Sequence, residues 1–187
     1  MSKSFRQPLT PEELRELASL LRQAFRCISK LKKLNSAARR ITYPKLPSAF
    51  SESIVVHCGP TLFPSAKTIH LGHGHQADVI FVASNRTKKV EVKATGGKEF
   101  QQFGPKDINA DFLVWIAFGP VFEKQADDTV RIYVLAKPKR VFPDKTKITL
   151  ARFKKQAAGK LACYEAKLSD LIDGRVRACS DNLPHGF

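Results

Sequence analysis

Apolar residues near the start of the chain recur at steps of three and four residues, a spacing that predicts an amphipathic helix. These residues are Leu14, Leu17, Leu21, Phe25 and Ile28. The preceding stretch LTPEEL offers Thr10 as N-cap, Pro11 at the first helical position and Glu13 as the reciprocal capping partner. We expect this helix to break near Asn35 and to be followed by a loop through the proline-containing stretch YPKLPS.

The middle of the chain alternates helix and strand signals. SAFSESIVVHCG predicts a short helix, with Ser48 as its cap and Gly59 as its stop. The runs AKTIHL, ADVIFVA, KKVEVKA, FLVWIAF and TVRIYVLA predict strands, and FLVWIAF is apolar enough to be buried on both faces. YEAKLSDLIDG predicts a final helix that ends at Gly174. This order predicts an α/β or α+β fold with a central mixed sheet flanked by helices.

The chain has 187 residues, enough to bury a core as one domain over 1–187. We expect a basic helical segment at about 10–40, a core at about 48–136 and a basic segment at about 137–187. Lys and Arg number 32 against 17 Asp and Glu, a formal net charge of +15. This surplus favours a polyanionic partner, most commonly nucleic acid, over a basic protein that binds anions loosely.

Cysteine spacing and hydropathy bear on the compartment. None of the four cysteines forms a C-x-x-C pair, so a zinc ribbon and a thioredoxin motif are not expected. No apolar secretory leader and no apolar run of membrane-spanning length is present. We therefore expect a cytoplasmic protein with free thiols and no membrane partner.

The stretch ADVIFVASNRTKKVEVKAT places acids and a lysine within two predicted strands. If Asn85 and Arg86 form the centre of the turn, Asp78 faces Lys93 and Glu91 lies diagonally from Asp78. Any turn with an even number of residues keeps these three side chains on one face of the sheet. The other face would then be a packing face, formed by Val79, Phe81, Val90 and Val92. The simpler alternative is a solvated charged face on which Asp78 and Lys93 form a surface ion pair.

Two carboxylates that converge beside a lysine are costly to place together unless a cation holds them. Mg²⁺ binds one or two carboxylates and leaves positions for water and substrate phosphate. A neighbouring lysine can orient the attacking water or stabilise the charge that develops on the phosphate. The pattern therefore predicts phosphodiester hydrolysis.

These residues resemble the PD-(D/E)xK nuclease superfamily, whose fold is that of type II restriction endonucleases. Asp78 matches the aspartate of the motif and EVK matches its (D/E)xK part, although Ala77 stands where the motif has proline. The resemblance extends over about 49–118. It implies a Mg²⁺-dependent site-specific endonuclease, with Mn²⁺ as a possible substitute, that acts on double-stranded DNA as a homodimer. In that case Asp78 and Glu91 bind the metal, Lys93 positions water and Glu52 is a supporting acid.

A second E-x-K sequence, Glu165 to Lys167, also fits the pattern. It lies in the predicted final helix, where residues two apart point in different directions, so we favour Glu91 and Lys93. The histidines of HLGHGH, namely His70, His73 and His75, form either a zinc site or, as we prefer, a loop at the rim of the site.

Candidate DNA contacts lie in two places. The stretch KATGGKEFQQFGPKD offers a possible reading loop with Lys98, Gln101, Gln102 and Lys106. The segment 137–160 holds nine Lys or Arg against one acid, and begins with Lys137, Lys139 and Arg140. This segment either contacts phosphates of the nucleic-acid backbone or is a solvated surface. Three other functions remain open: a repair or junction-resolving nuclease, a non-catalytic nucleic-acid-binding protein, and a nuclease fold that has lost activity.

Overall fold

A seven-stranded mixed sheet lies at the centre of the computed structural model, which describes residues 6–72, 77–96, 100–123 and 129–179. Its strand order is β1-β2-β3-β5-β6-β8-β9, and β3 and β5 are parallel whereas the other neighbours are antiparallel. The strands are β1 (Thr68–Leu71), β2 (Val79–Ala83), β3 (Arg86–Gly96), β5 (Phe112–Gly119), β6 (Thr129–Ala136), β8 (Leu161–Lys167) and β9 (Arg177–Ala178). The fold is therefore mixed α+β, in agreement with the coarse class expected from the sequence.

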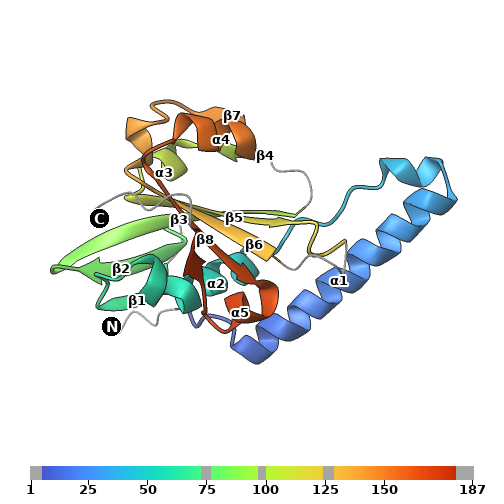
Figure 1. The fold of residues 1–187 in the computed structure, drawn as a ribbon, viewed down its shortest axis with the longest axis horizontal. Helices are drawn as coiled ribbons and strands as arrows, with labels where there is room; N and C mark the ends of the chain where they lie inside the picture. Colours follow the sequence, from blue (N-terminus) through green and yellow to red (C-terminus); the bar gives the residue numbers. More distant parts are fainter. Residues whose placement is uncertain (1–5, 73–76, 97–99, 124–128, 180–187) are drawn as a thin grey trace.

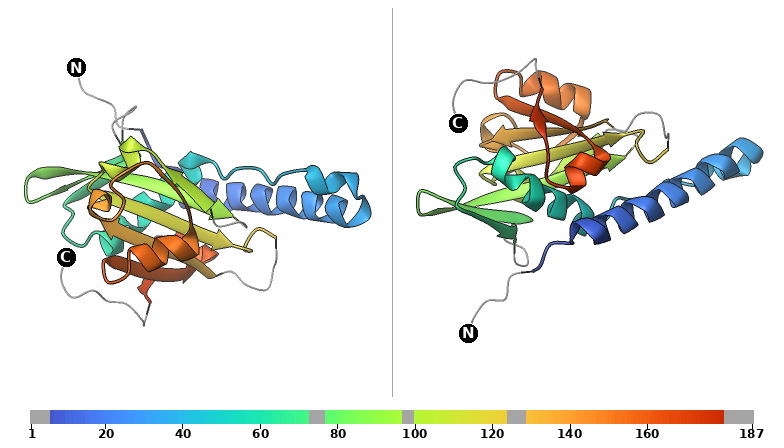
Figure 2. Two further views of the ribbon diagram at one scale, coloured as in Figure 1. Left: turned by 90° about the horizontal axis from the view of Figure 1, so that it is seen from above. Right: turned by 60° about the horizontal axis from the view of Figure 1, so that its bottom comes forward.

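Helices cover both faces of this sheet (Figures 1 and 2). One face packs against α2 (Ser48–Leu62), α5 (Leu168–Ile172) and the first half of α1 (Pro11–Leu34), which is followed by the 3-10 turn η1 (Ala37–Arg40). The other face is covered by α3 (Pro105–Ile108), α4 (Leu150–Gln156) and a small sheet of β4 (Phe100–Phe103) and β7 (Thr146–Thr149). The 3-10 turn η2 (Pro138–Arg140) lies beside α3.

β5 separates two hydrophobic cores, because its side chains alternate between the faces of the sheet. Val114 and Ile116 belong to the core under α2, whereas Leu113 and Trp115 belong to the core under α4. All residues from Leu113 to Phe118 are buried. The prediction of a strand buried on both faces is confirmed.

The first helix begins as predicted, and the second does not. In α1 the Thr10 side chain and Glu13 form the reciprocal capping box, and the helix ends at Asn35. α2 has Pro47 at its N-cap without a side-chain hydrogen bond, and it continues past Gly59 to Leu62. A Cβ at position 59 would lie 2.3 Å from the Cδ1 atom of Ile69, so this glycine allows close packing against β1 instead of ending the helix.

The final predicted helix is wrong over its first half. Leu161–Lys167 forms strand β8, which pairs with β6 along its whole length, and only Leu168–Ile172 is helical. Pairing with a neighbouring strand overrides the weak helical pattern of this stretch. Gly174 follows the helix with a φ of 75°, a conformation that favours glycine.

The expectation of four free thiols is also wrong. Cys163 on β8 and Cys179 after β9 form a disulfide, with their Cα atoms 5.4 Å apart. The backbone N–H of Cys179 also donates to the carbonyl oxygen of Cys163 at 2.9 Å, so strand pairing places the two sulfur atoms together. Cys27 and Cys58 are free. Within the described ranges, no helix has the length and apolar character needed to cross a membrane.

Candidate active site

The β2–β3 hairpin places the predicted acids on one face of the sheet. Its two-residue loop is Ser84 and Asn85, with φ angles of 49° and 59°, and Ala83 pairs with Arg86. The predicted turn centre was wrong by one residue, so Asp78 precedes the Val79–Val90 pair and lies beside Glu91 instead of Lys93. The even loop length preserves the expected alternation. The predicted packing face is confirmed, because the side chains of Val79, Phe81, Val90 and Val92 are all buried.

One ammonium group joins the two acids. The Nζ atom of Lys106, on α3, lies 2.9 Å from Oδ1 of Asp78 and 3.1 Å from Oε2 of Glu91. Lys106 was predicted as a DNA contact, but here it is the counter-ion of the acidic pair. Because both carboxylates bind one nitrogen atom, they converge closely enough to share a cation.

Glu91 is not part of a solvated face, because only 1% of the residue is exposed. Asp78 is held in place by its other oxygen, Oδ2, which accepts a hydrogen bond from the backbone N–H of Val92 at 2.8 Å. The interpretation of this face as a solvated surface is therefore wrong for Glu91. A buried carboxylate requires a paired charge or a bound proton, and both are available here.

Lys93 lies on the same face and binds a third acid that was not predicted. Its Nζ atom is 2.7 Å from Oδ1 of Asp107, and Oδ2 of Asp107 accepts the backbone N–H of Gly104 at 2.7 Å. Asp107 is therefore fixed at the start of α3 and fixes Lys93 in turn. The stretch GPKD resembles a helix start with an acid in its first turn, which was the available signal for Asp107.

Glu52, the predicted supporting acid, lies on α2. Its side chain is buried, and among the described residues its Oε2 atom has no hydrogen-bond partner, although Nη2 of Arg6 lies 3.5 Å away. Burial, reinforced by the negative charge of Asp78, raises the pKa of Glu52. Asp78, Glu91 and Lys106 form one electrostatic unit, and the charges of Asp78 and Lys106 also act on the pKa of Glu52.

The electrostatics of this unit favour a shared proton or cation. Burial, and next the negative charge of Asp78, raises the pKa of Glu91 to about 7. Burial lowers the pKa of Lys106, but hydrogen bonds to Asp78 and Glu91 outweigh this effect and raise the pKa overall. Lys106 therefore stays charged while Glu91 titrates near neutral pH.

The oxygen atoms of the carboxylates around Lys106 are of the kind that a hard divalent cation prefers. In the described part of the chain, no three side chains of His, Cys, Asp or Glu are arranged to hold a metal ion. The available donors are nevertheless carboxylate oxygens, which Mg²⁺ and Mn²⁺ prefer, and Oε2 of Glu52 is a buried oxygen without a hydrogen-bond donor. Asp78 and Glu91 would hold the ion once Lys106 moves away.

The predicted DNA contacts are dispersed around this centre. The Nε2 atom of Gln101 donates to the carbonyl oxygen of Ala94 at 2.8 Å, whereas Gln102 is exposed on β4. Lys137, Lys139 and Arg140 are exposed, and Nζ of Lys139 donates to Oδ1 of Asn109, directly after α3. This basic turn therefore flanks the element that carries Lys106. Lys98, His73 and His75 lie outside the described residues.

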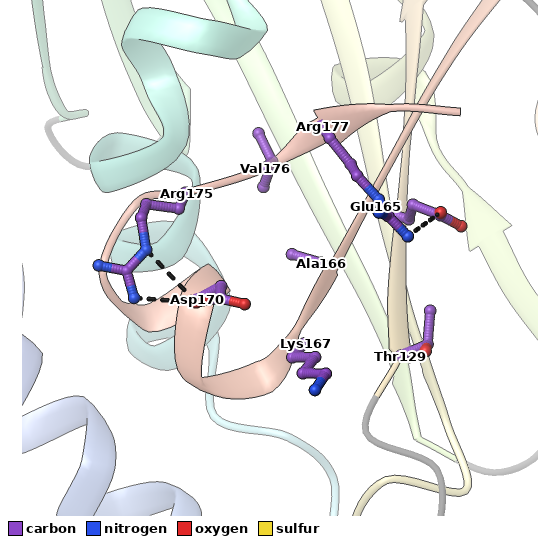
Figure 3. Close-up of a pocket in the computed structure, with 8 residues that line it drawn as sticks. All are labelled: Thr129, Glu165, Ala166, Lys167, Asp170, Arg175, Val176 and Arg177. Atoms are coloured by element: carbon purple, nitrogen blue, oxygen red, sulfur yellow. Dashed lines mark hydrogen bonds and ion pairs between the residues drawn. The ribbon is translucent and has the colours of Figure 1, made fainter. Parts of the chain in front are cut away.

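The second E-x-K sequence lies on a strand as well, but arginines neutralise its surroundings (Figure 3). Glu165 binds Nη2 of Arg177 at 2.9 Å, and the neighbouring Asp170 binds Arg175 at 2.8 Å. These residues line a cavity of about 420 Å³. Both carboxylates are thus engaged by guanidinium groups that are themselves largely exposed. The prediction that this E-x-K sequence lies in a helix was wrong. Its ion pairs with arginine are nevertheless a reason to favour Glu91 and Lys93 as the site.

The mixed sheet flanked by helices is observed, whereas the restriction-endonuclease-like fold remains a prediction. Comparisons with models of protein families, with curated protein sequences and with solved structures found no match to this chain.

Proposed function

We propose that this chain is a divalent-metal-dependent endonuclease that hydrolyses phosphodiester bonds in double-stranded DNA. The observation that carries the proposal is the convergence of the Asp78 and Glu91 carboxylates on one ammonium group, with Lys93 two residues beyond Glu91 on the same face. A buried carboxylate with a raised pKa, such as that of Glu91, next to fixed cations is typical of catalytic centres. The mixed sheet and the resemblance to the PD-(D/E)xK superfamily agree with this function.

Each side chain has a separate role in this proposal. Asp78 and Glu91 bind Mg²⁺ or Mn²⁺, which supplies positive charge that polarises the phosphodiester and favours deprotonation of water. Lys93, held by Asp107, orients the attacking water and stabilises the negative charge that develops on the phosphate. Glu52 supports the centre from α2 through Oε2, which accepts no hydrogen bond from the described residues.

Lys106 acts as a temporary counter-ion in the free protein. A like charge would repel an incoming metal ion, so its ammonium group has to leave Asp78 and Glu91 before the ion binds. About 41% of the Lys106 side chain is exposed, so the side chain lies at the surface of the molecule. In the proposed mechanism Lys106 therefore exchanges two carboxylates for a phosphate group.

We expect the substitution Lys106→Met to strengthen Mg²⁺ binding about tenfold, because the competing charge is removed while the length of the side chain is retained. The measurement is the increase in melting temperature as Mg²⁺ is added. Lys139→Met is the matched control, since Lys139 is an exposed lysine that contacts Asn109 beside α3 but no acid. Equal Mg²⁺ responses of the two variants would contradict the counter-ion role of Lys106.

The free energy of unfolding should depend on pH through the protonation of Glu91. Its pKa rises from 4.5 in the unfolded chain to about 7 in the fold, mainly because of burial. The folded chain then binds this proton more tightly, so the contribution to stability is present below pH 4.5 and is lost as the pH rises to about 7. The wild type should therefore become less stable relative to Glu91→Gln between about pH 5 and about pH 8, as measured by urea unfolding without metal. A difference that stays constant with pH would contradict the raised pKa.

DNA is the proposed substrate because the chain carries a large positive charge, and because part of that charge lies next to the helix that carries Lys106. The net charge is +15, and the exposed Lys137, Lys139 and Arg140 flank the helix that carries Lys106. Phosphate contacts of this kind position a duplex without reading its sequence. A type II restriction role as a homodimer is the finer proposal, because a two-fold axis matches a palindromic site.

The test is incubation of supercoiled plasmid with Mg²⁺ and the purified chain, beside the Lys93→Ala variant. Discrete fragments indicate site-specific cleavage, and a smear indicates a nonspecific or repair nuclease. The second candidate function is a DNA-binding protein in which Lys106 is a permanent counter-ion, a view favoured by its two short contacts with Asp78 and Glu91. Plasmid that is retarded but intact would support this candidate and exclude the nuclease.

A further inference from the structure

α1 extends well beyond the core that it helps to build (Figures 1 and 2). Its buried residues end at Phe25, yet the helix continues to Leu34, and η1 follows at Ala37–Arg40. We define residues 26–42 as the arm. Leu31 and Leu34 on the arm are 48% and 83% exposed, so burial of apolar surface in this chain does not explain why the arm exists.

The arm is strongly and uniformly basic. Between Glu16 and Glu52 the sequence contains eight Lys and Arg residues and no acid. Six of the eight lie in the arm, namely Arg26, Lys30, Lys32, Lys33, Arg39 and Arg40. Among the described residues, Lys30, Lys33, Arg39 and Arg40 are exposed and have no carboxylate partner. A second copy of the chain would bring like charges together here, whereas a polyanion would neutralise them.

A groove lies between the base of the arm and the end of β3, the strand that carries Glu91 and Lys93. It has a volume of about 380 Å³ and is lined by residues 43–46, by residues 94–96 at the end of β3, and by Phe100 and Gln101. Thr95, which lines the groove, lies two residues after Lys93 and therefore on the same face of β3. The groove therefore lies along the same strand as the candidate active site, between that strand and the base of the arm.

Phe100 is the available aromatic ring in this groove. Tyr43 also lines it, but its ring stacks on Phe25 with centroids 4.8 Å apart, and its hydroxyl group lies 2.9 Å from Oγ of Ser29. Phe100 is 51% exposed and has no such aromatic partner among the described residues. An exposed aromatic ring beside a basic surface is suited to stack on an unpaired base, which a base within a duplex does not offer.

We propose that the groove and the arm bind a single-stranded segment of the nucleic-acid substrate, next to the duplex that is cut. Phe100 stacks on an unpaired nucleobase, and Lys45 contacts a phosphate where the groove meets the arm. The arm then lies along the sugar–phosphate backbone of the strand as it leaves the groove. This inference rests on the proposed function for the position of the cut, and it assigns a tailed or branched duplex as the preferred substrate class. The exposed leucines can lie against sugars and base edges.

The test is fluorescence anisotropy with labelled oligonucleotides in EDTA, with the full-length chain. The probes are a blunt duplex, a single strand and a duplex with a single-stranded tail. We expect the tailed duplex to bind most tightly. Phe100→Ala should weaken its binding about tenfold but change binding of the blunt duplex less than about twofold, and Phe100→Tyr should restore it. An equal effect of Phe100→Ala on all three probes would overturn the proposal.

The arm is tested with two variants that remove the same charge. Replacing Lys30, Lys33, Arg39 and Arg40 by serine should weaken binding of the tailed duplex more than about tenfold. The control replaces the exposed Lys67, Arg86, Lys89 and Lys167, which lie outside both candidate DNA-contact segments, by serine and should weaken it less than about threefold. Equal losses, or binding of the arm to anionic lipid vesicles but to none of the oligonucleotides, would overturn the proposal. Because EDTA prevents cleavage, these results stand apart from the plasmid assay, which tests the proposed nuclease function alone.

Discussion

Replacing Asp78 by asparagine should lower the rate of DNA cleavage at least about 1,000-fold. Asparagine preserves the shape of the side chain, and its amide oxygen can still accept the hydrogen bond from Val92. The negative charge is lost, however, and with it one of the two proposed ligands of the metal ion. The measurement is single-turnover cleavage of a labelled duplex at saturating Mg²⁺.

Asp111→Asn is a closely matched control for this substitution. Asp111 also accepts one hydrogen bond from a lysine, Nζ of Lys88 at 3.2 Å, and one from a backbone N–H, that of Lys89 at 2.9 Å. It differs from Asp78 in that no second carboxylate shares its lysine in the described part of the chain. The control should retain most of the activity. Similar losses in the two variants would mean that the loss reflects disturbance of the sheet instead of chemistry at Asp78.

The substitution Lys93→Ala should lower the same rate about 100- to 1,000-fold, because the cation that orients water and stabilises the phosphate is removed. Binding of the duplex should change much less, since one partly exposed lysine contributes little to the attraction of a chain with a net charge of +15. The loss should therefore appear in the rate at saturating enzyme and not in the enzyme concentration that gives half of that rate.

Lys88→Ala is the control for Lys93, because Lys88 lies on the same strand and also pairs with an aspartate, Asp111. It should cleave at close to the wild-type rate. A similar decrease for Lys88→Ala and Lys93→Ala, or a Lys93→Ala variant with full activity, would remove Lys93 from the proposed mechanism. The melting temperatures of both variants show whether either substitution disturbs the fold.

Local patterns in the sequence predicted much of this arrangement. The capping box at Thr10 and Glu13 depends on residues three apart, and strand alternation from Val79 to Val92 depends on residues two apart. Such short-range rules placed Asp78, Glu91 and Lys93 on one face even though the predicted turn was wrong by one residue. Glu52, which the family resemblance implied as a supporting acid, lies within electrostatic range of Asp78.

Long-range contacts could not be predicted in the same way. Lys106 and Asp107 reach the centre because α3 folds over the face of the sheet, and no spacing in the sequence specifies that contact. The strand at Leu161–Lys167 likewise exists because β6 is available to pair with it, which also brings Cys163 to Cys179. In the second case the tertiary partner also determines the local structure.

Titration of the chain with Mn²⁺, followed by the relaxation of water protons, tests most directly whether the Asp78 and Glu91 carboxylates form a metal site. We predict saturable binding to the wild type that Mg²⁺ competes away, and affinities at least about 100-fold weaker for Asp78→Asn and Glu91→Gln. Equal Mn²⁺ affinities for the wild type and these two variants would contradict the metal site and the nuclease function built on it.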